Sequence, residues 1–157
     1  MKRPARIAGL GVKSGIDEDM FVTAFLGLLD TRTGIVNYVN AGHPWPHILR
    51  ASGELTPIVG KSDMPLGLHS AAVFHGHAVT LWPGDLIFAF SDGIVEATDE
   101  SGNLYGHARL QAQLRAARSN VTPAQLVRAV TEGVQAFTGS APKSDDVTAL
   151  ALRWVPA

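Results

Sequence analysis

Two acidic segments of this 157-residue chain have the residue types and positions that metal-dependent chemistry requires. Ser91-Asp92-Gly93 directly follows the apolar run 86–90, and Lys143-Ser144-Asp145-Asp146 precedes an alternating segment, 147–155. A carboxylate at the end of a buried strand is held by rigid backbone, and Mg²⁺ and Mn²⁺ prefer such oxygen ligands. By itself the first segment is more typical of an Asp-Gly turn and the second of a solvated loop. Together they favour a shared cation site, because each supplies ligands that the other lacks.

A third candidate is the turn Asn40-Ala41-Gly42-His43-Pro44, in which His43 could be a general acid, a metal ligand or a surface residue. His75 and His77 share one face of a predicted strand, a pattern seen in zinc sites, but no third ligand lies near them in the sequence. No Gly-x-Ser-x-Gly segment occurs, so the sequence does not predict a serine nucleophile on a sharp strand-to-helix turn.

The composition excludes several classes of protein. With 46% hydrophobic and 17% charged residues, the chain is globular and not disordered. Thirteen basic against fourteen acidic residues give a net charge of −1, so we expect no nucleic-acid partner and no binding to a membrane surface. The absence of cysteine excludes disulfides, thiolate metal sites and cysteine nucleophiles. No apolar run approaches the roughly 20 residues of a membrane-spanning helix. We therefore expect a cytoplasmic protein.

The elements that would position these residues begin with a β-rich half. Six segments have the apolar content or the alternation of β-strands and are separated by irregular or turn-like residues: 20–29, 35–40, 46–50, 54–59, 77–82 and 85–91. Tight turns between neighbouring strands predict antiparallel sheets. The alternating segment 147–155 predicts a central strand that closes the domain.

Two helices are predicted between the last two strands. Residues 108–118 place Leu110 and Leu114 at helical spacing. Thr122 and Pro123 have the types preferred at a helix start, and Gly139 is typical of a helix end. The second helix has one apolar stripe, made of Leu126, Val127, Val130, Val134 and Phe137. Strands followed by grouped helices indicate the α+β class.

The order of seven short motifs resembles that of the PPM-type metal-dependent protein phosphatases. The motifs are Met20–Phe25, Tyr38–Pro44, Pro65–Leu68, Pro83–Asp85, Ser91–Ala97, Tyr105-Gly106 and Asp145–Thr148. The branch most similar is the bacterial sporulation and stress-response branch, whose members dephosphorylate anti-sigma-factor antagonists. The resemblance covers residues 20–155.

This resemblance implies a sandwich of two antiparallel β-sheets flanked by helices, with a binuclear Mn²⁺ or Mg²⁺ site. A metal-activated water would hydrolyse phosphoserine or phosphothreonine in a protein substrate. Asp92 and Asp145 would ligate one metal, although the motif leaves open which of Asp145 and Asp146 binds. Gly93 would shape the turn. Asn40 and His43 fall where relatives with a third metal carry an acidic residue, so they are further candidates near the site.

The resemblance does not extend to the family's N-terminal strand pair, whose Gly-Asp motif bridges the two metals. Residues 1–19 are expected to be a poorly ordered or remnant segment, and residues 20–157 the C-terminal portion of a phosphatase domain. Asp17 and Asp19 follow no buried strand and are not expected to bridge metals. Such a fragment would expose strand edges, which a missing N-terminal segment or a second copy in a homodimer could cover. The alternative function is a non-catalytic partner-binding module that keeps only the fold.

Overall fold

The computed structural model describes residues 21–69, 71–117, 121–143 and 145–156, which form two compact units. The first is built from residues 21–45 and Val59–Leu81, and the second from Pro46–Ile58 and Trp82–Val155. The expectation for residues 1–19 lies outside the described residues. Each unit contains one antiparallel sheet, so the predicted α+β class with two antiparallel sheets is confirmed.

The sheet of the first unit has the order β1-β2-β5. Its strands are β1 (Ala24–Leu29), β2 (Ile35–Ala41) and β5 (His77–Thr80). The β1–β2 hairpin closes through a turn in which the Gly34 N–H donates to the Asp30 carbonyl at 2.8 Å. Gly34 has φ 73°, a conformation that L side chains rarely adopt, which explains why glycine ends this turn. Tyr38 lies opposite Gly27 and His77 in the register.

The sheet of the second unit has the order β4-β3-β6-β7 and is antiparallel throughout. Its strands are β3 (His47–Leu49), β4 (Leu55–Pro57), β6 (Leu86–Phe90) and β7 (Ala149–Arg153). Although β5 and β6 are separated only by residues 81–85, they belong to different sheets and do not form a hairpin.

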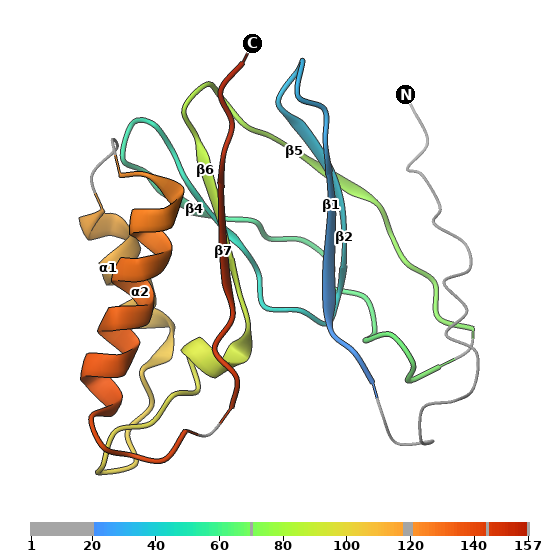
Figure 1. Ribbon diagram of the computed structural model, residues 1–157. Coiled ribbons are helices and arrows are strands. Elements are labelled where there is room, and N and C mark those ends of the chain that lie inside the picture. The colour runs from blue at the N-terminus through green and yellow to red at the C-terminus, as the bar shows by residue number, and fades with distance from the viewer. Residues whose placement is uncertain (1–20, 70, 118–120, 144, 157) are drawn as a thin grey trace. The chain divides into compact units, whose positions relative to one another are not determined.

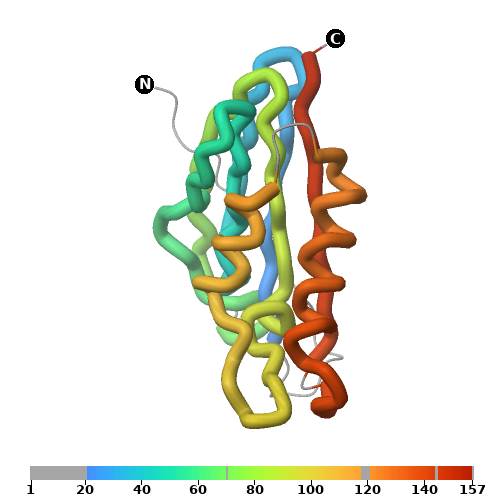
Figure 2. The backbone as a smooth tube through the Cα atoms, turned by 90° about the vertical axis from the view of Figure 1, so that its left-hand side faces the viewer, coloured from blue at the N-terminus to red at the C-terminus, as the bar shows by residue number. Residues whose placement is uncertain are grey.

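Helices α1 (Gly106–Ala116) and α2 (Pro123–Thr138) lie together on one face of the four-stranded sheet, as Figures 1 and 2 show. Thr122 caps α2, and Gln125 completes a reciprocal capping box, so two otherwise unpaired N–H groups are satisfied. The helices bury their predicted stripes against one face of β6. The core residues of this layer are Leu86, Phe88, Phe90, Leu110, Leu114, Leu126, Val130 and Val134.

The prediction that residues 147–155 form a central strand is wrong. In the described part of the chain β7 is the end strand of its sheet. Ala149 and Ala151 pack toward the helices, but Leu150 on the other face is 57% exposed. The alternation of residue types along a strand indicates only which face of the sheet each side chain lies on. It does not reveal whether the strand pairs with one neighbouring strand or with two.

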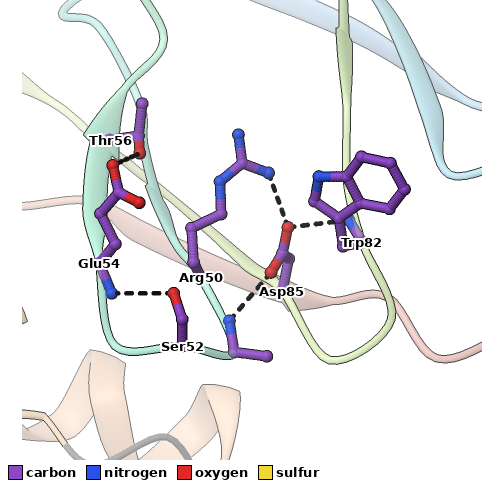
Figure 3. Close-up of polar contacts among 7 residues, drawn as sticks. Arg50, Ser52, Glu54, Thr56, Trp82 and Asp85 are labelled. Atoms are coloured by element: carbon purple, nitrogen blue, oxygen red, sulfur yellow. Dashed lines mark hydrogen bonds and ion pairs between the residues drawn. The ribbon is translucent and has the colours of Figure 1, made fainter.

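The start of β6 is anchored by a buried carboxylate (Figure 3). Asp85 is 1% exposed and accepts hydrogen bonds from the Arg50 guanidinium (2.7 Å), the Ala51 N–H (2.9 Å) and the Trp82 N–H (2.8 Å). These contacts join the β3–β4 hairpin to the first residue before β6. The strand that leads to Asp92 is therefore fixed at its start.

Within the described residues, neither helix has the length and apolar character needed to cross a bilayer.

Candidate metal-binding site

The first candidate ligand, Asp92, lies in a short 3-10 turn (η1, Asp92–Ile94) at the end of β6. Phe90, the last residue of the strand, is 2% exposed, whereas Asp92 is exposed. One carboxylate oxygen, Oδ1, accepts the Gly93 N–H at 3.0 Å. The turn itself therefore uses one oxygen of Asp92. Because Asp92 is exposed, its other carboxylate oxygen can still bind a cation from solvent.

Ser91 ties this turn to the segment before β7, although the two are more than fifty residues apart. The Ser91 hydroxyl donates to the Asp146 carbonyl at 3.0 Å and accepts the Thr148 N–H at 2.9 Å. The Ser91 N–H also donates to the Thr148 carbonyl at 2.9 Å. The sequence analysis named Ser91 only as part of the segment around Asp92 and missed this role. The available signal was a hydroxyl residue at the junction of a buried strand and an acidic turn.

Gly93 is required by close approach and not by an unusual backbone angle. A Cβ at this position would lie 2.4 Å from the Asp146 carbonyl oxygen and 3.5 Å from the Asp145 Cβ. The φ of Gly93 is not among the positive values that favour glycine. The expected role of Gly93 in the turn thus has a different physical basis, because any side chain would push the two acidic segments apart.

Asp145 is the member of the acidic pair that brings a side-chain atom beside this turn, whereas Asp146 approaches it with its backbone. Its Cβ lies in van der Waals reach of the Gly93 position, while Asp146 contributes its backbone carbonyl to Ser91. Asp145 is exposed, and its Oδ1 accepts the Asp146 N–H at 2.7 Å. The structure therefore places the Asp145–Asp146 segment against Ser91 and Gly93, the two neighbours of Asp92 in the chain, and the ligand roles of Asp92 and Asp145 stay a prediction.

These carboxylates fit a hard divalent cation as part of a coordination shell. Asp92 and Asp145 are both exposed and each has a second oxygen for which the described residues provide no hydrogen-bond donor. In the part of the chain that the structure describes, no three Asp, Glu or His side chains gather at one point. Mg²⁺ is commonly held by one or two carboxylates and keeps several waters, so two ligands suffice for weak binding.

Asn40 and His43 belong to the first compact unit and form a closed local turn. The fully buried Asn40 side chain donates to the His43 carbonyl at 2.8 Å and accepts the His43 N–H at 2.8 Å. The His43 ring contacts the Thr23 hydroxyl at 3.2 Å. These bonds give Asn40 a structural role in the turn, and a role near the metal remains a prediction.

An Asp–His pair in the first unit was not predicted. Asp63 is 8% exposed and accepts both the His75 N–H and a bond from His75 Nδ1, the latter at 2.7 Å. Burial alone would raise the pKa of Asp63, but the bonds from His75 outweigh it and hold that pKa below its usual value. His75 and His77 do not form a zinc site with a third ligand among the described residues.

Comparisons with known proteins identify a family. The model of the stage II sporulation protein E (SpoIIE) family matches residues 10–155. The chain is 27% identical over 137 residues to Protein IcfG of Synechocystis, covering 87% of this chain and 21% of that protein.

Solved structures share the fold. The phosphatase domain of the cell fate determinant SpoIIE from Bacillus subtilis matches with a TM-score of 0.66 and 20% identity, covering 85% of this chain and 56% of that one. The SiaA-PP2C domain of Pseudomonas aeruginosa matches with a TM-score of 0.70 and 23% identity, covering 83% of this chain and 51% of that one. The RsbU and RsbW domains of a Mycobacterium tuberculosis protein match with a TM-score of 0.68 and 28% identity, covering 86% of this chain and 37% of that one. The chain thus spans about half the length, or less, of these relatives.

Proposed function

Since this chain belongs to the stage II sporulation protein E (SpoIIE) family, we propose that it functions as part of a metal-dependent protein serine/threonine phosphatase. The resemblance to the sporulation and sigma-factor-regulating branch of the PPM-type phosphatases, predicted from the motif order, is confirmed by the family match. The observation that carries the proposed activity is the close approach of the Asp145–Asp146 segment to Gly93, the residue that follows Asp92.

In this proposal Asp92 and Asp145 hold one Mn²⁺ or Mg²⁺ ion through the oxygens that their own turns do not use. When bound, such a cation supplies an activated water and neutralises charge on a phosphoryl group. Ser91 and Gly93 keep the two ligand segments together. We assign the ligand role to Asp145, whose Cβ lies beside Gly93, and leave Asp146, whose backbone carbonyl accepts from Ser91, outside the coordination shell. Use of manganese is supported by the Bacillus subtilis SpoIIE domain, which was presoaked in Mn.

The proposed substrate is a phosphorylated cytoplasmic signalling protein, such as an anti-sigma-factor antagonist. Support comes from the Mycobacterium tuberculosis structure, which contains RsbU and RsbW domains, and from the sporulation family to which the chain belongs.

A second candidate function is a non-catalytic module that binds a partner through the phosphatase fold. The observation that favours it is the number of ligands: among the described residues no three acidic or histidine side chains gather where they could hold a metal ion. A module of this kind would bind its partner equally well with or without a divalent cation.

The two candidates are separated by a metal titration combined with an activity assay. Binding of Mg²⁺ is followed at the backbone amides of residues 91–93 and 145–148 by NMR. Hydrolysis of a phosphoserine peptide is followed with Mn²⁺, for this chain and for the gene product extended upstream. We expect Asp92→Ala and Asp145→Ala to weaken metal binding at least tenfold and Asp146→Ala, the matched neighbour, to change it little.

The phosphatase proposal is wrong if neither protein hydrolyses the peptide while both are folded. Loss of metal binding in Asp146→Ala but not in Asp145→Ala would reverse the assignment of the ligand. Partner binding that survives chelation and Asp92→Ala would support the non-catalytic module.

A further inference from the structure

A cavity of about 300 Å³ lies in the second compact unit and includes the proposed ligand Asp145 in its lining. One wall is the C-terminal half of α2, a second comes from Gly93, Ala97 and Thr98, and the third from residues 142, 143, 145 and 147. Because Gly93 and Asp145 belong to both the lining and the candidate metal site, the cavity adjoins the place where a phosphate would bind.

The walls are held by hydrogen bonds and do not depend on a ligand. Beyond the end of α2, Ser140 donates from both its N–H (3.2 Å) and its hydroxyl (2.5 Å) to the Glu100 carboxylate. This contact joins the loop that follows α2 to the loop that follows η1. On the other side Ser91 bonds the turn of Asp92 to residues 146 and 148. The cavity is therefore preformed, as ligand sites usually are.

The lining is suited to an apolar group. Ala97, Val134 and Val147 contribute only hydrocarbon. The two α2 threonines in the wall have already used their hydroxyl protons: Thr131 donates to the Val127 carbonyl at 3.1 Å, and Thr138 donates to the Gln135 carbonyl at 3.1 Å. The wall formed by Ala97, Val134 and Val147 offers a guest hydrocarbon contact, and the side-chain donors of the lining belong to Thr98, Gln135 and Lys143.

The charged lining residues are both exposed. Lys143 and Asp145 carry opposite charges, so a guest in the cavity needs no net charge of its own. A volume of about 300 Å³ is at the lower limit for small-molecule sites, which run from about 300 to 1,000 Å³. The size and chemistry fit one large aliphatic side chain better than a cofactor.

We propose that this cavity binds an apolar side chain of the phosphoprotein substrate, one or two residues from the phosphorylated serine or threonine. The inference rests on the proposed phosphatase function, because it assumes that the phosphate is held near Asp145. Consecutive Cα atoms are about 3.8 Å apart, so a residue next to the phosphorylated one reaches a cavity that shares a wall with the metal site. The cavity would then select substrates by the residue beside the phosphorylation site.

The test compares two phosphoserine peptides that differ only in their flanking residues, leucine on both sides or glycine on both sides. Affinity is measured by NMR titration in Mg²⁺, which also reports where each peptide binds. Burying a leucine side chain favours binding, so we expect the leucine peptide to bind about tenfold more tightly or better. Its additional shifts should appear at the amides of Thr131, Gln135 and Thr138.

Two variants are designed to fill the cavity, and a third variant serves as their control. Thr131→Phe places a ring in the wall, and Gln135→Trp does the same from an exposed position in case the first does not fold. Ala136→Phe adds a ring to an exposed α2 residue that does not line the cavity. The filled variants should bind both peptides with the affinity of the glycine peptide, and the control should keep the tenfold preference.

Equal affinity of the wild-type chain for the two peptides would overturn the inference, as would loss of the preference in Ala136→Phe. Failure of the proposed function has a different signature, the absence of Mg²⁺-dependent shifts at Asp92 and Asp145. Leucine-dependent shifts at α2 without any metal-dependent shifts would mean that the cavity binds apolar side chains but not as part of a phosphatase site, which also overturns the inference.

Discussion

The two ends of strand β6 each carry an aspartate, and the structure uses them in opposite ways. Asp85, at the start, is 1% exposed and accepts three hydrogen bonds, one of them from the Arg50 guanidinium (Figure 3). Asp92, past the end, is exposed and accepts one bond from the next residue in the chain. Both belong to motifs that resemble those of the phosphatase family. Only Asp92 retains the capacity to bind something else.

This difference shows how one strand can be both anchored and functional. A buried carboxylate needs donors to offset the loss of water, and donors that satisfy it also occupy its oxygens. A ligand for a cation must keep an oxygen available. The fold therefore has its saturated carboxylate at the start of β6 and its available carboxylate beside β7.

The largest expected effect is on stability, at the buried end. Asp85→Ala removes three hydrogen bonds and a buried partner of Arg50, and we expect it to cost about 3 kcal/mol of unfolding free energy. Asp92→Ala should change that free energy by no more than about 0.5 kcal/mol, since the residue is exposed. Urea unfolding measures both. Similar losses of unfolding free energy in the two variants would show that Asp85 does not stabilise the fold more than Asp92 does.

The next largest effect is expected at Gly93, where the turn after β6 contacts the segment that precedes β7. Gly93→Ala places a Cβ against the Asp146 carbonyl, and we expect a loss of about 1–3 kcal/mol together with weaker metal binding. Gly60→Ala is the matched control, because its Cβ would meet nothing nearer than 3.4 Å. Thermal unfolding of the two variants gives the comparison. A Gly93→Ala protein as stable as the control would contradict the close approach.

Binding of a divalent cation should distinguish the two ends directly. At a Mg²⁺ or Mn²⁺ concentration ten times Kd, we expect the unfolding free energy to rise by about 1.4 kcal/mol. The gain should disappear in Asp92→Ala and Asp145→Ala and persist in Asp85→Asn, where the binding residues are intact. Unfolding curves with metal and with chelator measure it. A gain that is lost only in the Asp85 variant would place the cation at the wrong end of β6.

The smallest effect is a pH dependence that arises beside β6. His47 pairs with Phe88 across the sheet and is 4% exposed, and the described residues offer neither of its ring nitrogens a hydrogen-bond partner. Burial, followed by the charges of His107 and Arg115, lowers the pKa of His47 below its ordinary value of 6.5. The unfolded chain then takes up the proton first, so stability should fall as the pH drops below about 6.5.

This pH dependence is measured by urea unfolding at pH 7.5 and 5.5. The wild-type chain should lose more stability between these values than His47→Phe, which has no proton to gain. His69→Gln, a change at an exposed histidine, should behave as the wild type does. An identical pH dependence in wild type and His47→Phe would show that folding does not lower the pKa of His47.

Much of the secondary structure could be predicted because its signals are local. Leu110 and Leu114 are buried on α1 as expected, and Thr122 and Pro123 begin α2. The strand boundaries differ by up to four residues, since ladder pairing and not alternation decides where a strand stops. The place of β7 at the end of its sheet in the described part of the chain could not be predicted, because its pattern does not reveal how many neighbouring strands it has.

The sequence by itself determined the family, the α+β class and the two acidic segments, because residue order and short-range patterns carry that information. Only the tertiary structure decided how these segments meet. The Ser91 bonds to residues 146 and 148, the fit of Gly93 against Asp146 and the cavity beside Asp145 all join residues more than fifty positions apart. The tertiary structure also distinguished Asp85 from Asp92, since burial and hydrogen-bond donors decide whether a carboxylate stabilises the fold or remains available to bind a cation.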